Sequence, residues 1–114
     1  MAHDILIVDD ESDIRMLTAS VLEDEGHETR EAHDSTAALA AIEARRPNLV
    51  LLDIWLKDSQ LDGMEILETI SIMDPEVPVV MMSGHGNIET AVSAINLGAY
   101  DFIEKPFTSD RMIL

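Results

Sequence analysis

Three aspartates and one lysine each stand at the end of a short segment rich in apolar residues. Asp9 and Asp10 follow residues 5–8, Asp53 follows residues 49–52, and Lys105 comes shortly after residues 100–103. Continuous apolar runs of this kind are typical of strands buried on both faces of a parallel sheet. Because parallel strands end at one edge of their sheet, we expect the acids and the lysine to meet there.

The three aspartates together indicate a cation site. A lone aspartate at a strand end is more often a helix cap or a solvated loop residue. Three carboxylates held close together repel one another, and a bound cation relieves that repulsion. Mg²⁺ fits such a group, because it takes one or two carboxylates and keeps water molecules that phosphate oxygens can replace. The chain has no cysteine, and its histidines are scattered, which disfavours zinc.

Phosphoryl transfer is the chemistry that these residue types suit. The Asp53 carboxylate can act as a nucleophile and form an acyl phosphate. A bound cation supplies positive charge on one side of the phosphoryl group, and Lys105 can supply it on the other. Ser83, which ends another apolar segment, can donate a hydrogen bond to a phosphoryl oxygen. The sequence therefore predicts a phosphoryl-accepting site with Asp53 as the acceptor.

Composition excludes several other classes of function. The chain has 114 residues, of which 46% are hydrophobic, and this suits one domain with a real core. Its formal net charge of −16 argues against direct binding of nucleic acid or of an anionic membrane. The N-terminus has no basic leader, and no apolar run approaches the roughly 20 residues of a membrane span. We expect a cytoplasmic protein.

Strand-like and helix-like segments alternate along the chain. Strands are expected at residues 4–8, 28–32, 48–53, 77–82 and 99–104, and helices are expected to begin near residues 11, 34, 62 and 87. This alternation predicts an α/β fold with a single doubly wound parallel five-stranded sheet. The polar segment 28–32 predicts an edge strand. A fifth helix, capped near Ser109, would have barely one turn before the chain ends.

Apolar spacing predicts the buried faces of the first and fourth helices. The expected inward residues are Ile14, Leu17, Val21 and Leu22 in the first helix, and Ile88, Ala91, Val92 and Ile95 in the fourth.

Four motifs resemble those of response-regulator receiver domains. They are Ile-Leu-Ile-Val-Asp9-Asp10-Glu11, Leu-Leu-Asp53, Met-Met-Ser83-Gly84 and Glu104-Lys105-Pro106-Phe107, and together they extend over nearly the whole chain. The resemblance implies a flavodoxin-like sheet of strand order 2-1-3-4-5. It also implies that a sensor histidine kinase phosphorylates Asp53.

The resemblance implies a cofactor and its ligands. Asp10 and Asp53 would bind Mg²⁺ directly, together with the backbone carbonyl of Trp55. Asp9 would act through a water molecule. Such a domain is not an enzyme, beyond catalysing its own phosphorylation and slow dephosphorylation.

The same resemblance implies how the site would respond to the phosphoryl group. Ser83 would contact the group and Lys105 would bridge to it, with a cis peptide bond between Lys105 and Pro106. Tyr100 matches the switch aromatic of the family, which turns inward as Ser83 moves. The alternative for Tyr100 is an edge-strand tyrosine that simply covers the fourth helix.

Residues 83–95 and 98–107 are similar to a narrower group, the receivers of NtrC-type transcriptional activators. In that group an AAA+ module and a DNA-binding domain follow, and phosphorylation controls their output. Neither is in this chain, so we expect residues 1–114 to be an excised N-terminal receiver domain. The resemblance implies a role in transcription and nitrogen regulation. It also implies pairing with a second copy through helix 4, strand 5 and helix 5.

The loop after Asp53 departs from the family pattern. The segment Trp55–Leu61 is two residues longer than is common and has no proline, although it borders the expected metal site. Trp55 is either a shield that slows attack of water on the phosphoryl group or a partly buried anchor of the loop.

Two other functions compete with a receiver. A haloacid-dehalogenase-type phosphatase also uses a strand-end aspartate and Mg²⁺, but it needs a second aspartate two residues later, where this chain has Trp55. A nucleotide- or flavin-binding module needs a loop rich in Gly, Ser or Thr after the first strand. This chain has Asp9-Asp10-Glu11 there, which would repel a phosphate.

Overall fold

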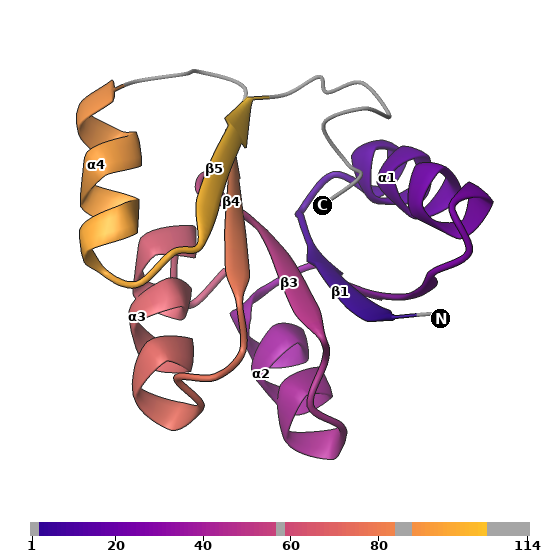
Figure 1. Cartoon of the computed structure of the whole chain (residues 1–114), viewed down its shortest axis with the longest axis horizontal. Helices are drawn as coiled ribbons and strands as arrows, with labels where there is room; N and C mark the ends of the chain where they lie inside the picture. The colour runs from indigo at the N-terminus through magenta and orange to yellow at the C-terminus, as the bar shows by residue number, and fades with distance from the viewer. Residues whose placement is uncertain (1–2, 57–58, 84–87, 105–114) are drawn as a thin grey trace.

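Five strands form one parallel sheet in the computed structural model of the chain, which describes residues 3–56, 59–83 and 88–104. They are β1 (Asp4–Val8), β2 (Glu28–Ala32), β3 (Leu49–Asp53), β4 (Val79–Ser83) and β5 (Asp101–Glu104) (Figure 1). The order across the sheet is β2-β1-β3-β4-β5, and each neighbouring pair is parallel. The predicted strand order is therefore confirmed, and the carboxyl ends of the strands share one edge.

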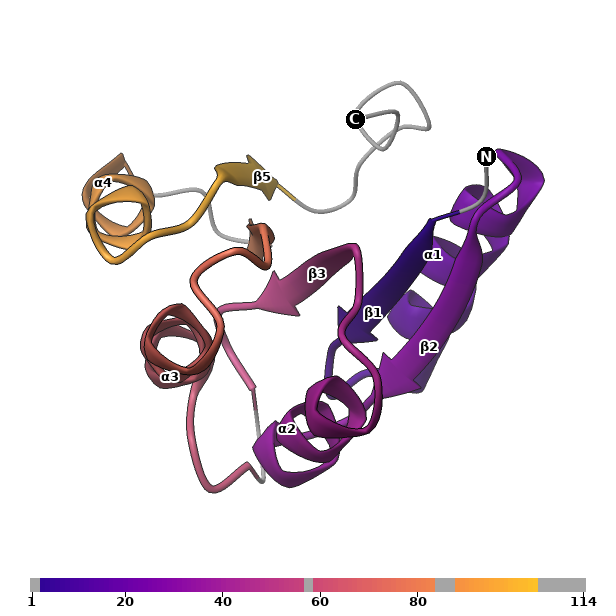
Figure 2. The same cartoon turned by 60° about the horizontal axis from the view of Figure 1, so that its bottom comes forward.

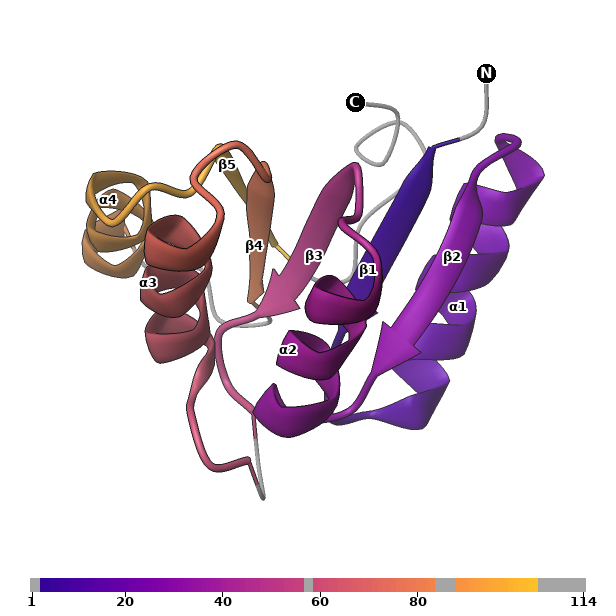
Figure 3. The same cartoon turned by 90° about the horizontal axis from the view of Figure 1, so that it is seen from below.

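Helices cover both faces of this sheet. Those described are α1 (Ser12–Asp24), α2 (Ser35–Ala44), α3 (Gly63–Met73) and α4 (Ile88–Asn96). Figure 3 shows α1 on one face of the sheet and α2, α3 and α4 on the other. This arrangement confirms the doubly wound α/β fold.

Successive residues of the central strands enter two separate apolar layers. In β1, Leu6 and Val8 pack with buried residues of α2 and α3, whereas Ile5 and Ile7 pack with buried residues of α1. Both sides of the strand are therefore buried, which explains why its sequence is continuously apolar. At the edge of the sheet, β2 has one buried residue, Ala32, as its polar sequence predicts.

The predicted inward faces of α1 and α4 are partly wrong. Leu17 of α1 is 58% exposed, and the buried residues of that helix include the small Thr18 and Ala19. In α4, Val92 and Ile95 are 53% and 46% exposed, and Ala94 is fully buried. Small residues at the contact let a helix backbone lie close to the sheet. The larger apolar side chains on either side of the contact are then left outside it.

Element boundaries differ from the predicted ones by one or two residues. β3 begins at Leu49, β4 at Val79 and β5 at Asp101, each slightly later than expected. Several expectations lie outside the described residues: Lys105, its cis bond to Pro106, the cap at residue 87 and the helix expected near Ser109. Among the described helices, none is long and apolar enough to cross a lipid bilayer.

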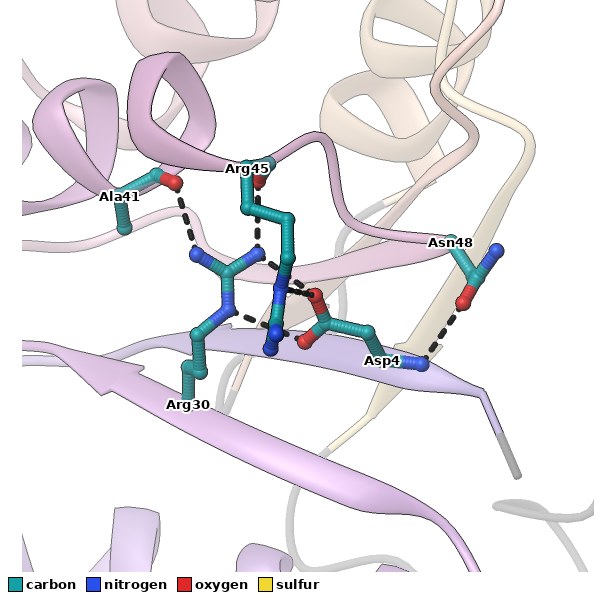
Figure 4. A network of polar contacts seen from close by, with 5 residues as sticks. All are labelled: Asp4, Arg30, Ala41, Arg45 and Asn48. Atoms are coloured by element: carbon teal, nitrogen blue, oxygen red, sulfur yellow. Dashed lines mark hydrogen bonds and ion pairs between the residues drawn. The ribbon is translucent and has the colours of Figure 1, made fainter.

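A polar network ties four elements together at the amino ends of the strands (Figure 4). Asp4 of β1 accepts hydrogen bonds from the Arg30 guanidinium of β2, at 3.0 and 2.8 Å. Arg45, which follows α2, donates to the same carboxylate at 2.9 Å. The backbone N–H of Asp4 donates to Asn48, which precedes β3. This network lies at the end of the sheet opposite to the acidic residues.

Candidate functional site

Three carboxylates meet at the carboxyl edge of the sheet. One oxygen from each of Asp9, Asp10 and Asp53 lies within 4.8 Å of the others. The parallel pairing of β1 with β3 sets Val8 opposite Leu52, so the residues that follow these two are brought together. The prediction that the three acids converge is confirmed.

These carboxylates are largely removed from solvent. Asp9 is fully buried and Asp53 is 3% exposed, while Asp10 is half-buried. Two of the carboxylates orient the backbone beside them. The N–H of Glu11 donates to Asp9 Oδ1 at 2.9 Å, and the N–H of Trp55 donates to Asp53 Oδ1 at 3.3 Å. Each aspartate therefore fixes the first turn of the loop that follows its strand.

Oxygen is the ligand type that this group offers. A hard divalent cation such as Mg²⁺ takes carboxylate and carbonyl oxygens and tolerates retained water, so the three carboxylates fit it. Asp10 is half-buried, so the group stays partly accessible to water and to a phosphate that could reach a bound ion. The burial of the other two means that a cation would be held in surroundings where its attraction to them is strong.

Ser83 ends β4 at the same edge and is 1% exposed. In the register of β3 and β4, Asp53 lies opposite Met82, the residue before Ser83. The N–H of Ile54 continues the ladder by donating to the Met82 carbonyl at 3.0 Å. The structure therefore places Ser83 on the strand beside the acceptor, as predicted.

Gly63 was not singled out from the sequence, yet it brings α3 against the acceptor strand. Its N–H donates to the Ile54 carbonyl at 3.1 Å. A Cβ at this position would lie 2.1 Å from the Asp53 carbonyl oxygen, so only glycine fits. Asp62 and Glu65 form a capping box that starts the helix at this point. In the sequence, the Asp-Gly pair just before an apolar helical segment is the feature that could have indicated this close contact.

Arg15 is a second contributor that the sequence did not reveal. Its guanidinium donates to the backbone carbonyl of Asp9 at 2.7 Å and to the Glu31 carboxylate at 3.2 Å. It therefore links α1 to the strand end that carries the acidic residues. No periodicity marks this role, because it depends on the folded path of the loop.

Two aromatic residues are exposed, Trp55 near this edge and Tyr100 beside β5. Trp55 is 58% exposed, and both its role as a shield and its role as a partly buried anchor of the loop stay predictions. Tyr100, just before β5, is 72% exposed. It lies at the amino end of β5, where its N–H donates to the Val79 carbonyl at 2.7 Å, at the edge of the sheet opposite to Ser83; its role as a switch stays a prediction.

Comparison with known proteins fits this fold and this group of acids. The family profile of the response regulator receiver domain matches residues 5–114. The chain belongs to this family. This chain is 67% identical over 114 residues to the nitrogen assimilation regulatory protein NtrX of Azorhizobium caulinodans. The match covers 100% of this chain and 25% of that protein.

Solved structures of other receiver domains have the same fold as this chain. The receiver domain of NtrX from Brucella abortus matches with a TM-score of 0.93 at 67% identity, over 96% of this chain and 92% of that one. The beryllofluoride-activated NtrC4 receiver domain dimer matches with a TM-score of 0.89 at 35% identity, over 96% of this chain and 89% of that one. The predicted resemblance to NtrC-type receivers is confirmed, and receivers of NtrX proteins are among the most similar.

The matched region is a small part of these relatives. The chain spans 25% of NtrX from Azorhizobium caulinodans and 23% of an NtrX-like response regulator from Rickettsia bellii. The matched family is a receiver domain, and the chain is similar to the receivers of NtrC-type response regulators; a receiver domain is not by itself a catalytic enzyme.

Proposed function

We propose that Asp53 accepts a phosphoryl group from a sensor histidine kinase. The observation that carries this proposal is the convergence of Asp9, Asp10 and Asp53 within 4.8 Å at the carboxyl edge of the sheet. In the transfer, a carboxylate oxygen of Asp53 forms a bond to phosphorus as the bond from phosphorus to the donor breaks. The product is an acyl phosphate on the protein.

The residues around Asp53 divide the remaining tasks. Asp10, Asp53 and the Trp55 carbonyl would hold Mg²⁺, with Asp9 acting through water. The ion supplies positive charge next to the phosphoryl oxygens. Ser83 donates a hydrogen bond to one of these oxygens, and Lys105 provides a counter-charge from the other side. Slow hydrolysis of the acyl phosphate would then reset the domain.

Acetyl phosphate with Mg²⁺, followed by intact mass, tests the acceptor. We expect one added phosphoryl group on the wild-type chain and none on Asp53→Asn. Asp13→Asn is the matched control, because Asp13 is an exposed acid on α1 outside the group, and it should still be modified. A phosphoryl group that persists in Asp53→Asn would contradict the assignment.

We also propose that phosphorylation changes the α4–β5 surface and promotes pairing of two copies. Val92 and Ile95 of α4 and Tyr100 before β5 expose 53%, 46% and 72% of their surface, and exposed large apolar side chains suit contact with a partner. The beryllofluoride-activated NtrC4 receiver is described as a dimer. Sedimentation with and without beryllofluoride tests the idea, and an unchanged monomer would exclude it.

The wider role follows from the relatives. We propose that residues 1–114 are the N-terminal receiver of a longer cytoplasmic transcription regulator, in which the receiver controls an AAA+ and DNA-binding output. Its relative in Azorhizobium caulinodans is described as a nitrogen assimilation regulatory protein, which makes nitrogen regulation the process to examine first. A deletion strain that keeps normal nitrogen-source responses would argue against this.

A further inference from the structure

Two serines tie the long loop between β3 and α3 to the first turn of α2. The backbone N–H of Ser35 donates to Ser59 Oγ at 2.9 Å. The Ser59 hydroxyl in turn donates to the Leu61 carbonyl at 2.7 Å, and the Leu61 N–H donates to Ser35 Oγ at 3.2 Å. Figures 2 and 3 show the part of this loop that leads into α3 passing near the beginning of α2. We call this closed set of three hydrogen bonds the serine bridge.

The serine bridge provides a hydrogen-bond acceptor for a backbone N–H at the N-terminus of α2, from a residue far away in the sequence. Ser35 is the first residue of α2, and the cap residue Asp34 uses its own side chain for the N–H of Ala37. The Ser35 N–H is one of the donors that a helix cannot pair internally. Ser35 is 2% exposed, so an unpaired N–H would be unfavourable there. Ser59, 24 residues away in the sequence, supplies the partner.

The serine bridge holds the loop on the side that faces α2. On its other side, an open cavity of ≈ 370 Å³ is lined by residues of the loop, α3 and α4, among them Trp55, Asp62 and Thr90. The two ends of the loop are fixed to the acceptor strand, through the Trp55 N–H on Asp53 and the Gly63 N–H on Ile54. Between these ends, in the described part of the loop, Leu56 and Leu61 pack against the apolar core, and the serine bridge supplies the hydrogen bonds that join the loop to α2.

We propose that Ser35 and Ser59 are positioning residues for the phosphoryl-accepting site. By anchoring residues 59–61 on α2, they position the end of the loop that leads into Gly63, whose N–H donates to the carbonyl of Ile54, the residue next to Asp53. The Trp55 carbonyl and the Asp53 carboxylate then keep a constant arrangement for a divalent cation. This inference rests on the proposed function, since it concerns the cation site of the same acceptor. It gives the extended loop a purpose, because its added length lets it reach α2.

Removing the Ser59 hydroxyl tests the bridge. We expect Ser59→Ala to weaken Mg²⁺ binding about tenfold, as the loss of an outer hydrogen-bond partner does at other metal sites. Ser59→Thr keeps the hydroxyl and should bind within about twofold of the wild type, on the same reasoning. Gln60→Ala is the matched control, because Gln60 is an exposed neighbour in the same loop, and it should leave binding unchanged.

Two measurements report the binding without any phosphorylation. Trp55 is the single tryptophan of the chain and adjoins the site, so its fluorescence can follow a titration with Mg²⁺. Calorimetry of the same titration gives an independent dissociation constant. Far-UV circular dichroism confirms that each variant is folded at the temperature used. Ser59→Thr tests whether the hydroxyl is the group required, and the circular dichroism spectra separate a positioning role from a general loss of folding.

Hydrogen exchange provides a test that needs no variant. The N–H groups of Ser35 and Leu61 should exchange slowly in the wild type, and exchange at the rate of an open loop would overturn the bridge. If the wild type binds Mg²⁺ and accepts a phosphoryl group but Ser59→Ala binds equally well, the inference is wrong and the proposed function stands. If the wild type neither binds Mg²⁺ nor accepts a phosphoryl group, both are wrong.

Discussion

At the scale of single residues, Gly63 has the least freedom near the acceptor. A Cβ here would lie 2.1 Å from the Asp53 carbonyl oxygen and 2.6 Å from Ile54 Cα, and both of these are backbone atoms. Backbone cannot rotate aside as a flexible side chain can. Any larger residue at this position must therefore displace either the start of α3 or the end of β3.

We expect Gly63→Ala to lower the free energy of unfolding by about 2 kcal/mol, the middle of the range for overpacked sites. It should also reduce phosphorylation of Asp53, because the strand end moves. Urea unfolding and the acetyl phosphate assay measure the two effects.

The matched control is Gly26→Ala. Gly26 has φ of 90°, so alanine is strained there, but its Cβ would meet nothing within 4 Å. That variant should lose stability and keep phosphorylation. Normal phosphorylation of Gly63→Ala would contradict the argument.

The acidic residues could be predicted from the sequence, but their neighbours could not. Asp9, Asp10 and Asp53 have distinctive types and follow recognisable strands, so the rule that parallel strands end together was sufficient to place them. The roles of Arg15 and Ser59 depend on where a helix or loop crosses another element. Nothing in the local sequence carries that information.

At the scale of elements, the polar network around Asp4 joins β1, β2, α2 and the start of β3 (Figure 4). Arg30 pairs with Asp4 and also donates to the carbonyls of Ala41 and Arg45, each at close range, 2.7 and 2.8 Å. These carbonyls belong to the end of α2, where a helix leaves acceptors unpaired and favours positive charge. One arginine thus closes the helix and fixes it to the edge strand.

This network makes stability depend on pH in the acid range. Burial alone would raise the pKa of Asp4, but hydrogen bonds and charge from Arg30 and Arg45 outweigh it and hold the pKa below the ordinary 3.8. A carboxyl whose pKa is lower in the folded state stabilises the fold above its unfolded pKa. That contribution is lost as the pH falls from about 3.8 through the folded pKa.

We expect Asp4→Asn to lower the free energy of unfolding at neutral pH by about 2 kcal/mol, as the loss of charged hydrogen bonds does. The difference from the wild type should shrink as the pH falls below 3.8, since the wild type then loses the same charge. Urea unfolding across this pH range measures it. Glu76→Gln is the control, because it removes only an exposed ion pair with Arg46 and should cost under about 1 kcal/mol. A difference that stays constant with pH would contradict the assignment.

The helix faces show what periodicity cannot predict. The apolar spacing of α4 correctly indicates an amphipathic helix, but Ala94 meets the sheet and the larger Ile95 is 46% exposed. Hydrophobic spacing identifies side chains that gain from burial; it does not identify which neighbour is present to cover them. The same limit explains Leu17 of α1. A surface that binds a partner and a surface that faces the core have the same pattern in sequence.

At the scale of the whole molecule, negative charge strongly outweighs positive charge. The chain has 23 acidic residues against 7 Lys and Arg, for a formal net charge of −16. Such a charge opposes the compact state through self-repulsion, and any cation screens it. Binding of Mg²⁺ to Asp9, Asp10 and Asp53 would come on top of this general screening. A useful experiment must therefore separate an ion held at one site from an ion atmosphere.

We expect MgCl₂ to raise the free energy of unfolding more than NaCl does at equal ionic strength. A ligand bound only by the folded state adds about 2.7 kcal/mol at one hundred times its dissociation constant. Asp10→Asn should abolish that additional gain and respond equally to both salts. Without Mg²⁺ the variant should be at least as stable as the wild type, because it removes one of three neighbouring like charges. Asp13→Asn makes the same charge change on the exposed side of α1 and should keep the full response to Mg²⁺.

The measurement is unfolding by urea, because guanidinium is itself a salt and would screen the charges. An equal gain from Mg²⁺ in Asp10→Asn and in the wild type would place the bound ion elsewhere on the acidic surface.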